Sequence, residues 1–183
     1  MIIGITGTLG AGKGAVVEYL VNTLGFEHYS MSGFITEEIE RRELVVNRDT
    51  MSLVANDLRA EHGPGYIAST LLARAKAASG NALIEALHST GEAEEIKKGG
   101  GIIIAVDADL KTRFERIRGR GSEKDDVTFE HFKKQNEREI ASADPTRHNI
   151  AGVMKMADYT LTNEGTLTEL YAQIDRVLEQ IKK

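Results

Sequence analysis

Short apolar runs alternate along the chain with segments whose apolar residues recur at helical spacing. The apolar runs predict strands at 2–6, 26–31, 82–84, 102–107 and 159–161. The amphipathic segments predict helices at 15–24, 35–42, 48–62, 66–78, 108–118 and 167–181, and one more that ends at Ile140. Strands that alternate with helices in this way predict a doubly wound α/β fold, with a parallel sheet covered by helices on both faces.

Polar residues, glycine and proline mark the ends of several predicted helices. Asn47 is suited to cap the helix that runs to His62. The triplet at 63–65, Gly-Pro-Gly, must end that helix and start the next, because proline is tolerated in a first turn and glycine supplies the preceding turn. A polar stretch covers 119–126, and Asp144-Pro145 predicts a loop.

Length and composition indicate one soluble globular domain. The chain has 183 residues, of which 41% are hydrophobic and 28% charged. No apolar run approaches the roughly 18–20 residues that span a bilayer, and the N-terminus lacks the features of a signal peptide. Cysteine is absent, which excludes disulfides and thiolate chemistry. We therefore expect a cytoplasmic protein with no membrane partner, either a monomer or a homodimer.

The charge distribution favours a small polyanion as ligand. The formal net charge of -5 argues against nucleic-acid binding, which needs a basic stripe along the phosphate backbone. Positive charge is concentrated in ten residues that contain Lys111, Arg113, Arg116, Arg118 and Arg120. Such a cluster suits a compact anion held at one place.

A phosphate-binding loop follows the first predicted strand. The segment from Gly7 to Lys13 satisfies G-x-x-x-x-G-K and lies between a strand and a helix, which is the context that this motif requires. Its glycines allow backbone N–H groups to converge on phosphate oxygens, and Lys13 can bridge the β- and γ-phosphates. We expect ATP to be held by Gly7, Thr8, Leu9, Gly10, Ala11, Gly12, Lys13, Gly14 and Ala15.

The loop and several later segments resemble known kinases. Glycine after the lysine resembles the adenylate kinase and nucleoside monophosphate kinase group. The segments 58–65 (LRAEHGPG), 112–116 (TRFER) and 157–167 (ADYTLTNEGTL) look like an archaeal adenylate-kinase-related family of unassigned function. The last of these segments is also similar to dephospho-CoA kinases.

This resemblance implies a three-layer α/β/α P-loop NTPase fold with a parallel five-stranded sheet. Its core would comprise 1–31, 81–118 and 155–183. A helical acceptor-binding insertion would occupy 32–80, and an arginine-bearing lid would occupy 119–150. The loop at 162–165 resembles the segment that contacts adenine in related kinases, which makes Asn163 a further ATP-binding candidate.

The magnesium site departs from the family pattern. Most P-loop kinases place a Ser or Thr hydroxyl on Mg²⁺ just after the lysine or one residue later, where this chain has Gly14 and Ala15. Glu85, at the end of a strand, is our candidate ligand, with a solvent-facing residue as the alternative. Asp107 ends the neighbouring strand and is either a second site residue or a helix cap.

The acceptor site departs from the pattern as well. Adenylate kinases hold the acceptor phosphate with two arginines, and the corresponding positions here are Thr36 and His88. Arg48 and Arg59 are the alternatives, because their spacing of eleven residues, about three turns, places them on one helix face. An exposed face with ion pairs explains them equally well. His88 is more readily a surface residue than a general base.

Further arginines are candidates for the transferred phosphoryl group. Arg113, Arg116 and Arg120 lie at i, i+3 and i+7, along one helix face. Arginines on a closing lid suit phosphoryl transfer, so Arg116 and Arg120 join Lys13 as candidate catalytic residues, against a solvated basic face. Arg138 is a candidate substrate ligand, although neighbouring glutamates offer it ion pairs.

Together these features predict an ATP- and Mg²⁺-dependent phosphotransferase with a small-molecule phosphate acceptor. A nucleoside or deoxynucleoside monophosphate is the leading acceptor, and dephospho-CoA is the alternative. An ATP-binding regulatory protein, or an ATPase without small-molecule kinase activity, is the hypothesis from another class.

Overall fold

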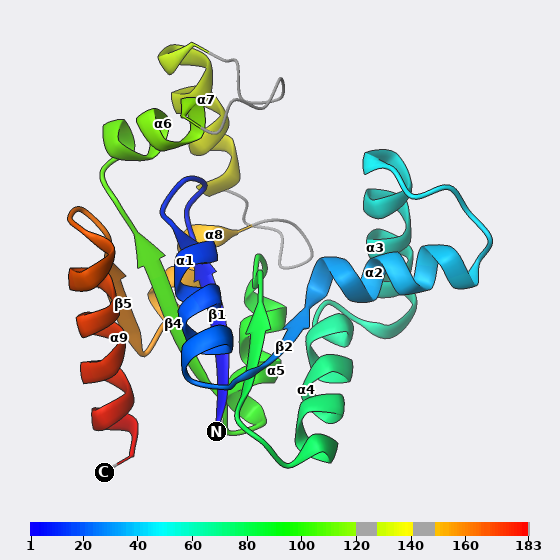
Figure 1. Ribbon diagram of the computed structural model, residues 1–183. Coiled ribbons are helices and arrows are strands. Elements are labelled where there is room, and N and C mark those ends of the chain that lie inside the picture. The colour runs from blue at the N-terminus through cyan, green and yellow to red at the C-terminus, as the bar shows by residue number, and fades with distance from the viewer. Residues whose placement is uncertain (120–127, 141–148, 183) are drawn as a thin grey trace.

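A parallel five-stranded sheet forms the centre of the molecule (Figure 1), as the sequence predicted. This computed structural model describes residues 1–119, 128–140 and 149–182. The strands are β1 (Ile2–Gly7), β2 (Glu27–Ser30), β3 (Ala82–Glu85), β4 (Ile102–Asp107) and β5 (Tyr159–Thr162). Their order across the sheet is β2-β3-β1-β4-β5, so β1 is the central strand and its neighbours come from later in the chain.

Helices cover both faces of the sheet. On one face lie α1 (Lys13–Glu18), the π-helical turn η1 (Tyr19–Thr23) and α9 (Leu167–Ile181), which pack on side chains such as Leu83 and Ile104. On the other face α4 (Tyr66–Ala78), α5 (Thr90–Lys98) and α8 (Ile150–Met156) pack on Ile84 and Ile103. Successive strand residues point to opposite faces, which is why the strands are continuously apolar.

Two short helices, α5 and α8, were not predicted from the sequence. In α5 only Ala93 and Ile96 are buried apolar residues with helical spacing, so its periodicity is weak. A capping box formed by Ser89 and Glu92 was the available signal. In α8 the seven residues include a glycine, and Ile150 and Val153 are the buried ones. The predicted loop at 144–145 lies outside the described residues.

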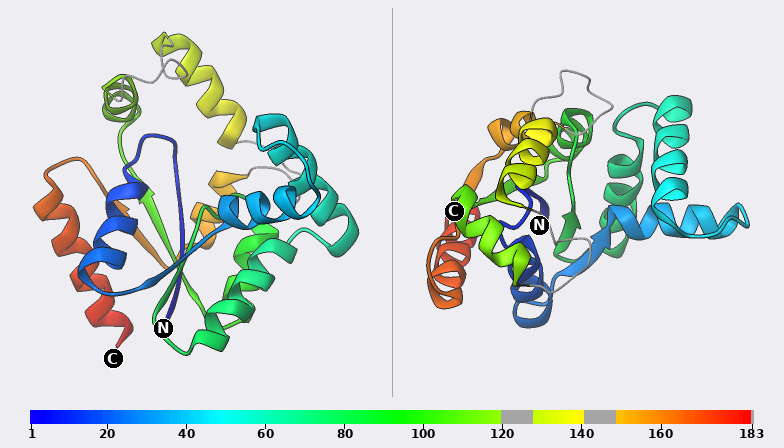
Figure 2. Two further views of the ribbon diagram at one scale, coloured as in Figure 1. Left: turned by 45° about the vertical axis from the view of Figure 1, so that its right-hand side comes forward. Right: turned by 90° about the horizontal axis from the view of Figure 1, so that it is seen from above.

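Two pairs of helices extend beyond the core. The helices α2 (Met31–Arg41) and α3 (Arg48–His62) project past β2, at the right of Figure 1. The helices α6 (Leu110–Arg118) and α7 (Phe129–Ile140) lie above the carboxyl ends of the strands, as Figure 2 also shows. Asn47 caps α3 as predicted, and accepts hydrogen bonds from the backbone of Asp49 and Thr50. No helix among the described residues is long and apolar enough to cross a membrane.

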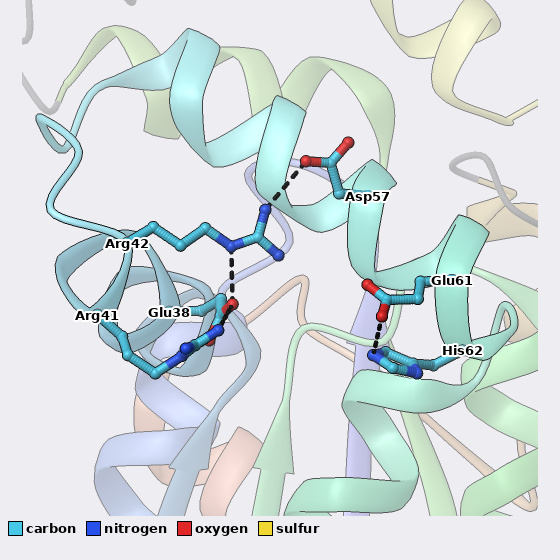
Figure 3. A network of polar contacts seen from close by, with 6 residues as sticks. All are labelled: Glu38, Arg41, Arg42, Asp57, Glu61 and His62. Atoms are coloured by element: carbon cyan, nitrogen blue, oxygen red, sulfur yellow. Dashed lines mark hydrogen bonds and ion pairs between the residues drawn. The ribbon is translucent and has the colours of Figure 1, made fainter.

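An ion-pair network joins α2 to α3 (Figure 3). Glu38 accepts hydrogen bonds from Arg41, the last residue of its own helix, and from Arg42, which caps that helix. Arg42 also donates to Asp57 on α3 at 3.0 Å. Hydrogen bonds from the guanidinium groups of Arg41 and then Arg42 lower the pKa of Glu38 from 4.5 to about 2. Because the folded-state pKa is the lower one, the network stabilises the fold above about pH 4.5 and is lost as the pH falls towards 2.

Replacing Glu38 by glutamine should therefore lower the urea midpoint of unfolding at pH 7, and the difference from the wild type should shrink as the pH falls from 4.5 towards 2. Glu40→Gln is the matched control, because Glu40 lies exposed on the same helix. Unfolding followed by circular dichroism at several pH values measures both variants. An equal effect of the two substitutions, or a difference that does not change with pH, would contradict the assignment.

Candidate functional site

The loop between β1 and α1 has a backbone that side chains would disrupt. Gly7, Gly10 and Gly12 have φ values of 145°, 81° and 96°, which L-residues with a Cβ rarely adopt. A Cβ at Gly10 would lie 2.7 Å from the carbonyl oxygen of Arg113, and one at Gly12 would clash with the side-chain amide of Asn163. The glycines are thus required both by the turn itself and by the groups packed against it.

The same loop presents the groups that a phosphate needs. Gly12 caps α1 and contributes no side-chain hydrogen bond, so the first-turn N–H groups and the positive end of the helix dipole face the loop. The ammonium group of Lys13 donates to the carbonyl oxygens of Gly7 and Thr8 at 2.9 and 3.0 Å. These bonds hold the cation across the loop, where phosphate oxygens would be its stronger partners.

Asp107 lies beside this loop and does not cap a helix. Its carboxylate accepts a hydrogen bond of 2.7 Å from the hydroxyl of Thr8, whereas the N-cap of α6 is Asp109. Since β1 and β4 are adjacent in the sheet, the end of β4 carries this carboxylate to the start of the phosphate loop. Of the two roles that the sequence left open for Asp107, the structure excludes the cap.

Asn163 supports the loop from the far end of the chain. Its buried side-chain amide donates to the carbonyl oxygen of Ala11 at 2.9 Å. Arg116 donates to the backbone oxygen of Asn163, also at 2.9 Å. The structure therefore brings one predicted residue, Asn163, to the phosphate loop, where its side chain stabilises the loop backbone, and places a second, Arg116, against Asn163.

Arg113 is a residue whose role the sequence did not reveal. It is buried, and its guanidinium donates to the carbonyl oxygens of Ala108 and Leu9 at 2.9 and 3.3 Å and to the side-chain oxygen of Asn136 at 2.7 Å. These bonds link the phosphate loop to the start of α6 and to α7. The helical spacing of Arg113 and Arg116 was the available signal, but it could not show that Arg113 reaches the loop and that Arg116 reaches Asn163.

Three of the arginines predicted as site residues lie wholly or partly outside the described part of the structure. Arg120 lies outside the described residues. Arg138 belongs to α7 and Arg48 is the first residue of α3, but their side chains lie outside the described part of the structure. Their assignments, as a catalytic residue and as substrate ligands, stay predictions.

Glu85 forms an interaction that was not expected. Its carboxylate lies within hydrogen-bond distance of the ring of His28 on β2, with 2.8 Å between Nε2 and Oε2. Its side chain is partly exposed, so it is neither buried nor freely solvated. Among the described residues, no three carboxylate or imidazole groups are clustered as a metal site. A magnesium ion at Glu85 would therefore depend on phosphate oxygens and water for most of its ligands.

A cavity of about 480 Å³ opens between α2, α3 and the segment that follows β3. One wall is apolar and contains Met31, Ile35, Met51 and Ala55. Its polar lining consists of Ser32, Ser52, Asn56, Arg59, His88 and Glu92. The cavity thus brings together two residues from the sequence analysis, Arg59 and His88. Thr36 is not part of the lining, and its hydroxyl donates to the carbonyl oxygen of Ser32.

The phosphate loop follows the central strand of a parallel sheet, and helices extend beyond the core of that sheet. These features define a kinase-like P-loop protein. The chain belongs to the UPF0200 family, and residues 3–142 match the model of the family described as AAA domain. It is 31% identical to a UPF0200 protein of Hyperthermus butylicus, across 99% of this chain and 95% of that protein. A UPF0200 protein of Pyrococcus horikoshii is also 31% identical, with 99% and 97% covered.

Solved structures share the fold. TT1252 from Thermus thermophilus matches with a TM-score of 0.65 and 20% identity, over 98% of this chain and 97% of that one. Shikimate kinase from Acinetobacter baumannii has a TM-score of 0.58 and 19% identity, with 99% and 94% covered. Dephospho-CoA kinase from Campylobacter jejuni has a TM-score of 0.54 and 15% identity, with 98% and 96% covered. The expected archaeal family and kinase-like fold are confirmed, whereas a specific relation to adenylate kinases is not.

Lys13→Ala should abolish measurable ATP binding, because it removes the cation that lies across the phosphate loop. Isothermal titration calorimetry with ATP·Mg²⁺ measures the loss. Lys155→Ala, an exposed lysine on α8, is the control and should bind as the wild type does. Unchanged affinity of the Lys13 variant for ATP would show that ATP does not bind at this loop.

Asn163→Asp should weaken ATP binding by about tenfold or more, since a carboxylate cannot donate to Ala11 and adds a negative charge beside the phosphates. Asn149→Asp is the matched control, because aspartate can still accept the capping hydrogen bond from Gly152. Calorimetric titration compares the two variants. Similar affinities for both would show that Asn163 does not support the loop.

Proposed function

We propose that this protein transfers the γ-phosphoryl group of ATP to a nucleotide-like acceptor bound in the cavity beside α3. The observation that carries the proposal is the position of that cavity relative to the phosphate loop. The backbone N–H of Leu87 donates to Ile5 of β1, and the residues on either side of it, Ala86 and His88, line the cavity. The acceptor would thus lie one strand away from the loop that begins at Gly7.

The residues around the loop suit the needs of phosphoryl transfer. The backbone N–H groups at 7–15 and Lys13 would hold the ATP phosphates, and Arg116 with Arg120 would place positive charge on the transferred group. An acceptor oxygen forms a bond to the γ-phosphorus while the bond to the bridging oxygen breaks and ADP leaves. Mg²⁺, when bound with ATP, would neutralise developing charge, with Glu85 and Asp107 as the nearest strand-end carboxylates.

A nucleoside or deoxynucleoside monophosphate is the leading acceptor within this proposal. Arg59 lines the cavity, and Arg48 and Arg138 are the further cations proposed to contact the acceptor. Dephospho-CoA is the second candidate, because the segment 157–167 resembles dephospho-CoA kinases. The fold shared with the Campylobacter jejuni enzyme agrees with both acceptors.

A non-kinase function is the alternative. Gly14 and Ala15 provide no hydroxyl for Mg²⁺, and Thr36 and His88 stand where adenylate kinases carry arginines. A protein with these replacements could bind ATP as a regulator, or hydrolyse it on a partner. The short distances from Lys13 and Asn163 to the loop agree with ATP binding under either hypothesis.

A coupled assay of ADP release with ATP·Mg²⁺ tests the proposal directly. The panel contains all nucleoside monophosphates, their deoxy forms and dephospho-CoA. We expect at least one acceptor to stimulate ADP release well above the rate with ATP alone, and the phosphorylated product to be identified by mass spectrometry. ATP binding without stimulation by any acceptor would favour the regulatory or ATPase alternative.

A further inference from the structure

A buried ion pair lies at the boundary between the acceptor cavity and the core. Arg59, in the last turn of α3, donates to Glu92 in the first turn of α5 at 2.9 Å. The Glu92 side chain is 1% exposed and that of Arg59 is 11% exposed. Both residues line the cavity, so a ligand inside it would meet the accessible edge of this pair.

Glu92 is held in place by the backbone and fixes Arg59. One carboxylate oxygen accepts from the N–H groups of His88 and Ser89 at 2.8 and 3.1 Å, as part of the capping box of α5. The other oxygen accepts from Arg59. The carboxylate therefore accepts three hydrogen bonds within the protein and fixes the position of the guanidinium at the edge of the cavity.

Arg59 retains donors that the protein does not use. Its Nε is buried and is the one such side-chain atom without a hydrogen-bond partner in the described ranges. Glu92 is the hydrogen-bond partner of its guanidinium within those ranges. A buried donor without an acceptor is costly, so the protein leaves the hydrogen bonding of this guanidinium incomplete. Nε itself has almost no accessible surface, so a ligand in the cavity would meet the accessible part of the Arg59 side chain, which is 11% exposed.

The chemistry of the pair limits what that ligand group is. Arg59 and Glu92 together are electrically neutral, so a second anion at this end would leave net negative charge in a poorly solvated place. A neutral acceptor avoids that cost. A guanidinium presents parallel N–H groups, which match two hydrogen-bond acceptors side by side on a flat group. The apolar wall of Met31, Ile35, Met51 and Ala55 suits the face of a ring.

We infer that the cavity selects an acceptor with a 6-oxopurine base, guanine or hypoxanthine, whose O6 and N7 accept hydrogen bonds from Arg59. This inference rests on the proposed function, because it specifies the acceptor of that reaction. Arginine bound to O6 and N7 is the usual way in which proteins read guanine. Adenine places an amino donor where the carbonyl would be, and that donor would face the N–H groups of Arg59. Uracil and thymine offer a carbonyl next to a ring N–H, which leaves one donor of the fork unmatched. Cytosine has two adjacent acceptors, O2 and N3, but its single ring would bury less surface against the apolar lining than the two fused rings of a purine.

Equilibrium binding tests the inference without catalysis. Wild-type protein is first saturated with a non-hydrolysable ATP analogue and Mg²⁺, so that the phosphate loop is filled, and is then titrated with GMP, IMP, AMP, UMP and CMP. We expect GMP and IMP to bind about five- to 150-fold more tightly than AMP, the range typical of one bidentate base contact. Equal affinities for GMP and AMP, or preference for AMP or CMP, would overturn the inference.

Two variants test whether the guanidinium group of Arg59 causes the preference for GMP over AMP. Arg59→Met should abolish the difference between GMP and AMP. Arg59→Lys keeps a positive charge opposite Glu92 and should reduce the difference, because an ammonium can still donate to O6 and N7 but lacks the fixed, flat fork of a guanidinium. Arg176→Met, an exposed arginine on α9, is the control and should keep the wild-type preference. Thermal unfolding confirms that each variant is folded, and a preference for GMP retained by the folded methionine variant would overturn the inference.

The outcome separates this inference from the proposed function. Transfer of phosphate to several nucleotides without base preference overturns the inference and leaves the kinase proposal intact. A preference for GMP and IMP that depends on Arg59 supports the inference, whether or not any acceptor stimulates ADP release. The absence of such stimulation would overturn only the kinase proposal.

Discussion

The close packing of Asn163 against the phosphate loop is the constraint on which the candidate ATP site depends. The loop needs left-handed backbone at Gly10 and Gly12, and the hydrogen bond from Asn163 to Ala11 holds that backbone in place. Arg116 in turn holds the backbone of Asn163, and Arg113 holds the carbonyl group of Leu9. Two segments distant in sequence, α6 and the residues after β5, thus keep the N–H groups of the loop oriented before a phosphate arrives, which reduces the ordering cost of binding.

A comparable arrangement supports the acceptor cavity. Glu92 connects the segment after β3 to α3, because it accepts from the backbone of His88 and Ser89 and from Arg59. The cavity therefore has one side fixed to the core and another formed by α2 and α3, which project from the sheet edge. The ion-pair network from Glu38 through Arg42 to Asp57 keeps these two helices together, so they would move as one unit.

The sequence was sufficient for the fold and for the phosphate loop because both follow from local patterns. Apolar runs such as 102–107 predicted the buried strands, and Gly7 to Lys13 predicted the loop. The roles of Arg113, Asn163 and Glu92 depend on contacts between residues 23 to 152 positions apart, which neither periodicity nor motif spacing can show. His28 likewise reaches Glu85 only because β2 and β3 are neighbours. Short α5 and α8 were missed because each buries few apolar residues.

The hydrogen bond between Asn163 and Ala11 joins residues separated by 152 positions. Strand β5, which delivers Asn163, is the last to be synthesised and pairs with β4 at the sheet edge. A nascent chain can therefore form β1 and the glycine turn early, yet lacks the amide that fixes the turn until the 152 residues that follow Ala11 have been added. Nucleotide binding would accordingly stabilise the completed fold far more than any shorter folding intermediate.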